Sequence, residues 1–197
     1  MTKTRLEAFS DGVIAIIITI MVLELKIPHE ATFAALSKLA PVFLSYLISF
    51  IFVAIYWGNH HHLLHTVHHV TSGIMWANMG LLFCLSLIPF STGWMGENHF
   101  DNVPVAIYGV SLLLCAVSYY FLQMCIMKHY THTTKLIIAL QKQRKKGIVS
   151  LVGYIVSISC AFFLPIVSAC VIVGIAIWWV IPDKNIEEAL KDQRQTA

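Results

Sequence analysis

Long apolar runs separated by short polar breaks dominate this chain. A helix that crosses a bilayer needs about 20 mostly apolar residues, because the hydrocarbon core is about 30 Å thick. Four runs meet this requirement and are predicted as membrane-spanning helices: 8–27, 40–63, 72–94 and 103–127. Pro28 closes the first run, and Pro41 and Pro104 open the second and the fourth, where proline is tolerated in the first helical turn.

The last apolar block, 148–182, is too long for one span. As a single helix it would measure roughly 52 Å at 1.5 Å per residue. Pro165 near its middle predicts a hairpin of two short spans, 148–164 and 166–182. Five spans plus an interfacial segment are the alternative. We therefore predict an all-α membrane protein with one transmembrane domain, 1–197, and six transmembrane helices.

Basic residues gather at the chain positions that six spans place on one side of the membrane. They flank the first span, fill the predicted loop 128–147 and occur in the tail 183–197: Lys3, Arg5, Lys128, Lys135, Lys142, Arg144, Lys145, Lys146, Lys184, Lys191 and Arg194. The other side holds only Lys26 and Lys38. The positive-inside rule then predicts a plasma-membrane protein whose termini and 128–147 loop are cytoplasmic.

Composition excludes several classes of protein. Hydrophobic residues make up 58% of the chain and charged residues only 12%, whereas soluble domains carry about 25% charged residues. The net charge of +3 and the absence of a basic aromatic surface argue against nucleic acid. No nucleophile–base pair or phosphate-binding glycine loop is present, so we expect no enzyme. The five cysteines lie in apolar runs without a CxxC and are interpreted as buried hydrophobes.

The first predicted helix carries polar groups that lipid would penalise. Asp11 is an intramembrane acid, which is a functional hypothesis by default. On a helical wheel of about 100° per residue, the helix has one face without charged residues, and the members of this face lie within about 60° of Ile16. Asp11 lies about 140° from Ile16. This bare face consists of Gly12, Ile16, Thr19, Ile20 and Leu23. The pattern taken alone fits a lipid-facing surface or helix packing as well as a pore.

Two motifs carry a family resemblance. The segment Arg5-x-x-x-Phe9-Ser10-Asp11, opening the first predicted helix, resembles the RxxxFSD signature of the transmembrane protein 175 family of potassium channels. The second predicted helix adds Trp-Gly-Asn-His-His at 57–61, which is similar to the Trp and His pattern of that family. The length and six-span layout resemble a prokaryotic, single-repeat member.

The resemblance implies a homotetramer in the lipid bilayer whose first helix lines a central pore for potassium and other monovalent cations, without a cofactor. In this family an apolar ring five residues after the motif aspartate forms the narrowest point, which here implies Ile16. The matching pore positions farther out are Ile20 and Leu23, with Thr19 as a hydroxyl layer. The resemblance also implies a set of residues that hold the first helix against the second. These are Arg5, Phe9, Ser10 and Asp11, with Trp57 and His60 as their partners.

Glu24 ends the first predicted helix and has two interpretations. Its carboxylate attracts cations to the outer mouth of the pore, or it pairs with nearby Lys26. Sequence alone does not separate the two.

A histidine cluster at the end of the second predicted helix gives the main alternative. His61, His65 and His68 share a helical face at a spacing that suits zinc or another transition metal. This pattern favours a zinc-type heavy-metal transporter as the second hypothesis. A di-iron enzyme is a weaker one, because such enzymes take histidines from several separated segments. A third interpretation is an interfacial helix end whose histidines titrate near neutral pH.

Overall fold

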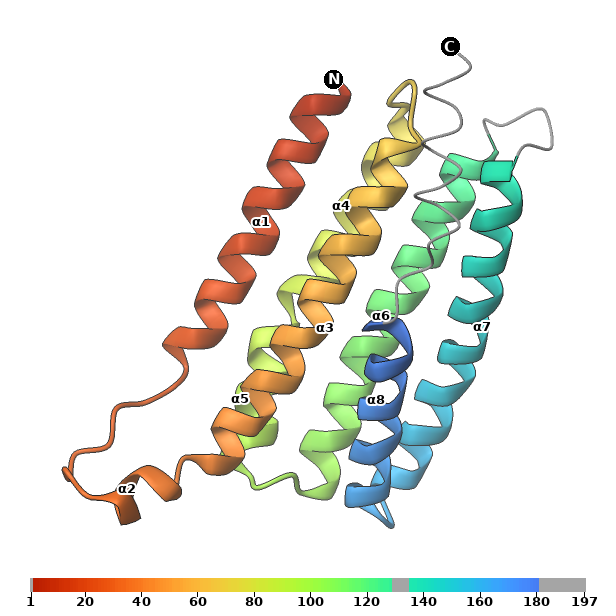
Figure 1. Cartoon of the computed structure of the whole chain (residues 1–197). Helices are drawn as coiled ribbons and strands as arrows, with labels where there is room; N and C mark the ends of the chain where they lie inside the picture. The colour runs from red at the N-terminus through yellow and green to blue at the C-terminus, as the bar shows by residue number, and fades with distance from the viewer. Residues whose placement is uncertain (1, 129–134, 181–197) are drawn as a thin grey trace.

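The computed structural model describes residues 2–128 and 135–180, and this described part is all helical (Figure 1). Its helices are α1 (Lys3–Leu23), α2 (Phe33–Ser37), α3 (Ala40–His65), α4 (Ser72–Ser86), α5 (Ile88–Glu97), α6 (Asn102–Met127), α7 (Lys135–Ala161) and α8 (Pro165–Val180). Four stretches of this described part are long and apolar enough to cross a membrane: α1, α3, α4 with α5, and α6.

The helices run up and down in one bundle (Figure 1). The start of α1, the α3–α4 turn, the end of α6 and the start of α7 lie at one end. Helix α2, the α5–α6 turn and the α7–α8 turn lie at the other end. Helix α8 has only 16 residues, which gives about 24 Å at 1.5 Å per residue and is short for a span.

Local sequence signals explain most helix boundaries. Thr71 begins α4 by accepting a hydrogen bond from the Ile74 backbone N–H at 3.4 Å, and Asp101 caps α6 through the Asn102 N–H at 2.7 Å. Pro89 divides the predicted 72–94 span into α4 and α5, because proline lacks the N–H that would bond one turn back. Pro165 is the first residue of α8.

Two predicted boundaries are wrong. Helix α1 begins at Lys3 and already ends at Leu23, whereas we predicted 8–27, so Pro28 lies beyond the helix and does not terminate it. Residues 135–147 were predicted as part of a loop and instead form the first half of α7. Lysine, glutamine and arginine are good helix formers, and Leu140 and Gln143 are buried. Helix α7 therefore begins before the apolar run, and its first half packs along α6.

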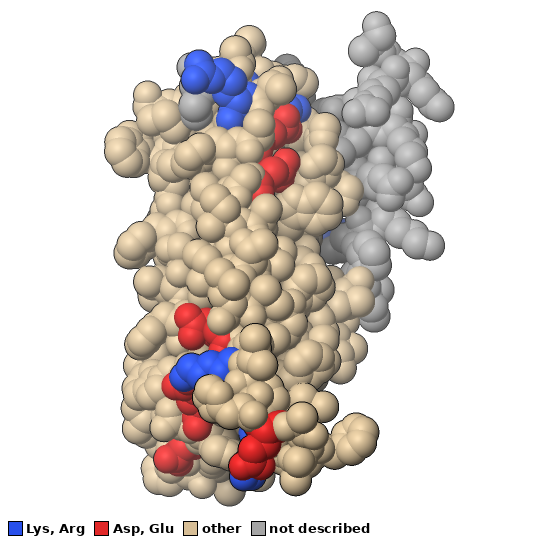
Figure 2. Space-filling view, turned by 90° about the vertical axis from the view of Figure 1, so that its left-hand side faces the viewer, with Lys and Arg blue, Asp and Glu red and all other residues tan. Residues whose placement is uncertain are grey.

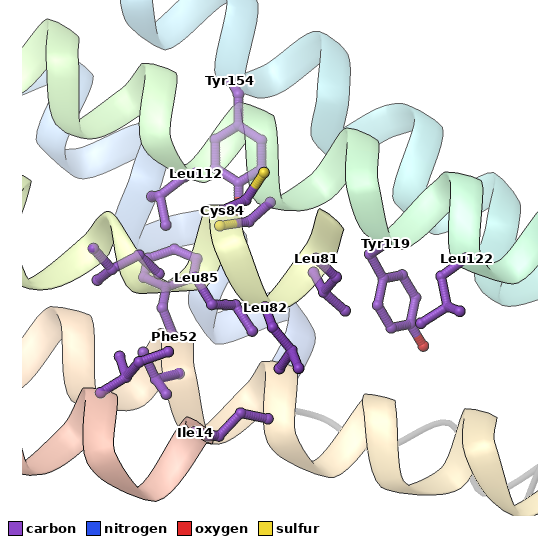
Figure 3. Packing of buried hydrophobic residues seen from close by; sticks show 14 of the residues in the cluster. Ile14, Phe52, Leu81, Leu82, Cys84, Leu85, Leu112, Tyr119, Leu122 and Tyr154 are labelled. Atoms are coloured by element: carbon purple, nitrogen blue, oxygen red, sulfur yellow. The ribbon is translucent and has the colours of Figure 1, made fainter. Parts of the chain in front are cut away.

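The core lies where α3, α4, α6 and α7 meet (Figure 3). Phe52, Leu85, Leu112 and Tyr154 are fully or nearly fully buried there, and Ile14 joins them from α1. The outside of the molecule is apolar as well. On the face that α1 presents, charged side chains gather at the two ends and are absent from the middle (Figure 2). Such a belt matches the hydrocarbon layer of a bilayer.

Small and hydroxylated residues bring the helices close together. Ser49 on α3 donates a hydrogen bond to Tyr108 Oη on α6 at 2.9 Å, and the Thr92 hydroxyl on α5 lies 2.6 Å from the same serine. Near the end of α5, a Cβ added at Gly96 would lie 2.4 Å from Ser45 Oγ and 2.8 Å from Val42 Cα. Only glycine lets α3 and α5 approach this closely, as is typical of membrane helix contacts.

We expect Gly96→Ala to lower the free energy of unfolding by about 1–3 kcal/mol, because the new methyl group overlaps the α3 backbone. Gly80→Ala is the matched control, since a Cβ at Gly80 meets nothing within 4 Å. Denaturant titration of both variants in detergent micelles measures the difference. Equal stability of the Gly96→Ala and Gly80→Ala proteins would contradict the packing described for α5.

Candidate functional site

Helix α1 lies at one edge of the bundle and packs through a single stripe (Figure 1). The stripe repeats every three to four residues and contacts α3, α4 and α5. Its buried members are Leu6, Ser10, Ile14, Ile17 and Met21. The opposite side of the helix is uncovered in the single chain.

A buried chain of hydrogen bonds joins α1 to α4 and α3. His60 Nε2 donates to Asn78 Oδ1 at 2.6 Å, Asn78 Nδ2 donates to Ser10 Oγ at 2.9 Å, and Ser10 Oγ donates to the Leu6 carbonyl at 2.8 Å. All three polar side chains are at most 1% exposed. Buried polar groups are costly unless they are hydrogen-bonded, so the three side chains fix the rotation of α1 relative to the bundle.

Asn78 is the member that sequence reasoning missed. An amide in the middle of the apolar 72–94 run was the available signal, because a polar residue at membrane depth almost always has a partner inside the bundle.

Two charged groups of α1, Lys3 and Asp11, contact α3. Trp57 Nε1 donates to Asp11 Oδ1 at 2.9 Å. Lys3 Nζ donates to the His65 carbonyl at 2.8 Å and lies 3.9 Å from Glu7 Oε1. The structure thus joins Asp11 directly to Trp57 on α3, and it joins Ser10 to His60 on α3 through Asn78 of α4.

The other two residues of the motif lie outside these contacts. Phe9 is 53% exposed, and the Arg5 side chain forms no hydrogen bond or ion pair with another described residue. The roles of Arg5 and Phe9 in holding α1 stay predictions.

The uncovered side of α1 contains the bare face expected from the helical wheel. Ile16 is 58% exposed, Ile20 42% and Leu23 79%. Thr19 is exposed too, and its hydroxyl donates to the Ile16 and Ala15 carbonyls at 2.8 and 3.1 Å. Since the proton of Thr19 is used within the helix, its oxygen presents only lone pairs outward. This face can therefore offer a cation apolar surface and one layer of acceptor oxygens.

A groove of about 660 Å³ lies between this side of α1 and the α4–α5 region. Its walls are mostly apolar and lead to an acid at one end. The lining includes Ile16 and Ile20 from α1, Glu24 directly after the end of α1, and Pro89, Phe90 and Trp94 from α5. Ile16 and Ile20 thus border a continuous hollow that ends at Glu24.

The histidine cluster is divided between different surroundings. His60 is buried in the hydrogen-bond chain described above, while the rings of His61 and His65 stack edge to face with centroids 4.4 Å apart. His68 lies beyond the end of α3, in the turn before α4. Within residues 2–128 and 135–180, no three histidine, cysteine, aspartate or glutamate side chains are arranged to hold a metal ion.

Comparison with known proteins identifies the family. A family model described as endosomal/lysosomal potassium channel TMEM175 matches residues 5–89. A potassium channel of Chryseobacterium sp. (strain P1-3) is 48% identical over 192 residues, which cover 98% of this chain and all of that protein. The chain belongs to the TMEM175 family. The resemblance inferred from the RxxxFSD motif is therefore confirmed.

Other TMEM175 relatives align over part of the chain. A potassium channel of Chamaesiphon minutus is 36% identical over 99 residues, covering 47% of this chain and 49% of that protein. The human endosomal/lysosomal proton channel TMEM175 is 38% identical over 99 residues, covering 44% of this chain and 19% of the human protein.

The fold is that of a solved TMEM175 structure. The crystal structure of a lysosomal potassium-selective channel TMEM175 homologue from Chamaesiphon minutus superposes with a TM-score of 0.81 at 26% identity. The match covers 92% of this chain and 97% of the other.

Replacing Asn78 tests the hydrogen-bond chain. In Asn78→Ala, His60 and Ser10 lose their partner in an apolar interior, so the free energy of unfolding falls by about 1–3 kcal/mol. Ser111→Ala is the matched control, because the Ser111 hydroxyl bonds only to the Ile107 carbonyl of its own helix. Thermal or denaturant unfolding of the two purified variants gives the comparison. If both variants lose the same stability, the buried chain does not hold α1.

Proposed function

We propose that this protein is one subunit of a homotetrameric potassium-selective channel and that the exposed face of α1 lines its pore. The observation that carries the proposal is the match over 98% of the chain to a protein named as a potassium channel, together with the fold shared with a TMEM175 channel structure. Four subunits around one axis bring four α1 helices together.

The side chains of α1 favour this helix as the pore lining. Asp11 is held by α3 and Ser10 by α4. The free side carries Ile16, Thr19, Ile20 and Leu23. An ion path needs a surface that no other part of the same subunit covers, and this uncovered side of α1 meets that condition.

Four Ile16 side chains facing one axis form a hydrophobic constriction. An apolar ring offers a passing ion no ligand in place of its water, and such a ring can close by dewetting. Potassium holds its hydration water less tightly than sodium, so potassium loses less free energy on entering the ring. The acceptor oxygen of Thr19 lies one turn away and replaces part of the lost hydration. The ring therefore favours potassium without a carbonyl filter.

The proposed topology has six spans and cytoplasmic termini in the plasma membrane. Helices α7 and α8 supply the last two spans, α7 through its apolar second half. Basic residues at the start of α1 and in α7 lie at the same end of the bundle (Figure 1), which the positive-inside rule assigns to the cytoplasm. The opposite end then faces outward.

Ile16→Asn tests the constriction. An amide side chain keeps the ring hydrated and supplies ligands to sodium as well as potassium, so the potassium-over-sodium permeability ratio falls toward one. Val22→Asn is the matched control, since Val22 is 44% exposed but lies about 120° from Ile16 on the helical wheel. Reversal potentials of the purified channel in planar bilayers give the ratio. An unchanged ratio in a folded Ile16→Asn tetramer would remove Ile16 from the filter.

The same bilayer separates the channel from the zinc-transporter hypothesis. Potassium current that persists with a strong metal chelator on both sides supports the channel. Loss of all potassium current on chelation would favour the histidine-based alternative.

A further inference from the structure

Lys26, just after the outer end of α1, has two possible glutamate partners, Glu24 and Glu97. In the structure it pairs with Glu97, which is distant in the sequence. Lys26 Nζ forms a hydrogen-bonded ion pair with Glu97 at the end of α5. Lys26 does not form an ion pair with Glu24, although Glu24 is only two positions away in the chain. The hydrogen bond and the charge of Glu97 raise the pKa of Lys26 above its usual value, and the charge of Glu24 makes a smaller contribution in the same direction. The lysine therefore stays charged near neutral pH.

Glu24 attracts Lys26 more weakly than Glu97 does, and its carboxylate has no direct ion-pair partner in the described part of the chain. Its side chain is exposed and forms no ion pair or hydrogen bond with another residue in the described part of the chain. Glu24 Oε2 lies beside α5, 3.8 Å from the position a Cβ would take on Gly93. The Glu24 carboxylate therefore lies against α5.

The position of Glu24 joins two hollows. It lines the groove that also contains Ile16 and Ile20, and it lines an outer cavity of about 210 Å³ with Lys26, Lys38, Glu97 and His99. Lys38 borders the outer cavity and does not reach the groove. Of the charged residues around these hollows, Glu24 is the one that lines both.

We propose that Glu24 concentrates cations at the outer mouth of the pore, and that Glu97 maintains this function by holding Lys26 away from the Glu24 carboxylate. The inference rests on the proposed channel function and extends it from the constriction to the entrance. In the tetramer four such carboxylates surround the axis. Their field raises the local potassium concentration, because cations accumulate where one sign of charge lines a cleft.

Salt concentration separates this role from a structural one. The Debye length is about 30 Å at 0.01 M salt and about 3 Å at 1 M. Glu24→Gln therefore lowers single-channel potassium conductance several-fold at about 10 mM KCl and leaves it nearly unchanged at about 1 M KCl, where screening removes the field. Glu30→Gln is the matched control, since Glu30 is an exposed acid in the same connection but lines neither hollow.

Further variants test the role of the Lys26–Glu97 pair. Glu97→Gln releases Lys26, which then neutralises Glu24, so low-salt conductance falls as it does in Glu24→Gln. Adding Lys26→Met to Glu97→Gln removes the competing cation and restores the wild-type value. Lys26→Met alone leaves Glu24 free and does not lower conductance.

The outcomes distinguish the two levels of the proposal. Wild-type protein that carries no potassium current at any salt concentration overturns the channel function itself. A conducting Glu24→Gln channel with wild-type conductance at 10 mM KCl, or an equal loss in Glu30→Gln, overturns the role of Glu24. If Glu97→Gln conducts like wild type while Glu24→Gln does not, the role of the Lys26–Glu97 pair is overturned.

Discussion

The rest of this structure depends on the buried hydrogen-bond chain from His60 through Asn78 to Ser10. In an apolar interior surrounded by lipid, a polar side chain without a partner costs more than the loss of one contact. Those groups must therefore meet inside the bundle, and only one rotation of α1 brings Ser10 to Asn78. The Asp11–Trp57 hydrogen bond favours the same rotation of α1. Polar contacts on one side of α1 thus decide which residues lie on its other side.

The function proposed for the molecule follows from that rotation. With Ser10 and Asp11 engaged by α3 and α4, the helix leaves a face that is apolar for most of its length and carries an acid at its outer end. In the proposed tetramer, this face lines a pore with a hydrophobic constriction and an entrance that attracts cations. This proposal separates ion selection from ion accumulation. The apolar ring discriminates between ions by the cost of dehydration, and the outer charge sets how many cations reach the ring.

Much of this architecture can be predicted from the sequence, because hydrophobic runs report membrane helices directly. Boundaries that depend on tertiary packing are less accessible. The basic start of α7 resembles a loop until Leu140 and Gln143 are seen to pack along α6. The site shows the same division, since RxxxFSD identifies the family and the helical wheel predicts the exposed face of α1. The Asn78 partner and the pairing of Lys26 with Glu97 join residues 68 and 71 positions apart, and no local pattern encodes them.

The central claim is that α1 borders a water-filled path in the tetramer, and cysteine accessibility tests it most directly. Ile20 and Val22 are about equally exposed in the single chain, yet only Ile20 lies on the proposed pore face. The account predicts that a charged, water-soluble thiol reagent added from outside reduces the potassium current of the Ile20→Cys channel. The same reagent leaves Val22→Cys and wild-type currents unchanged. An unaffected Ile20→Cys current together with a reduced Val22→Cys current would contradict it.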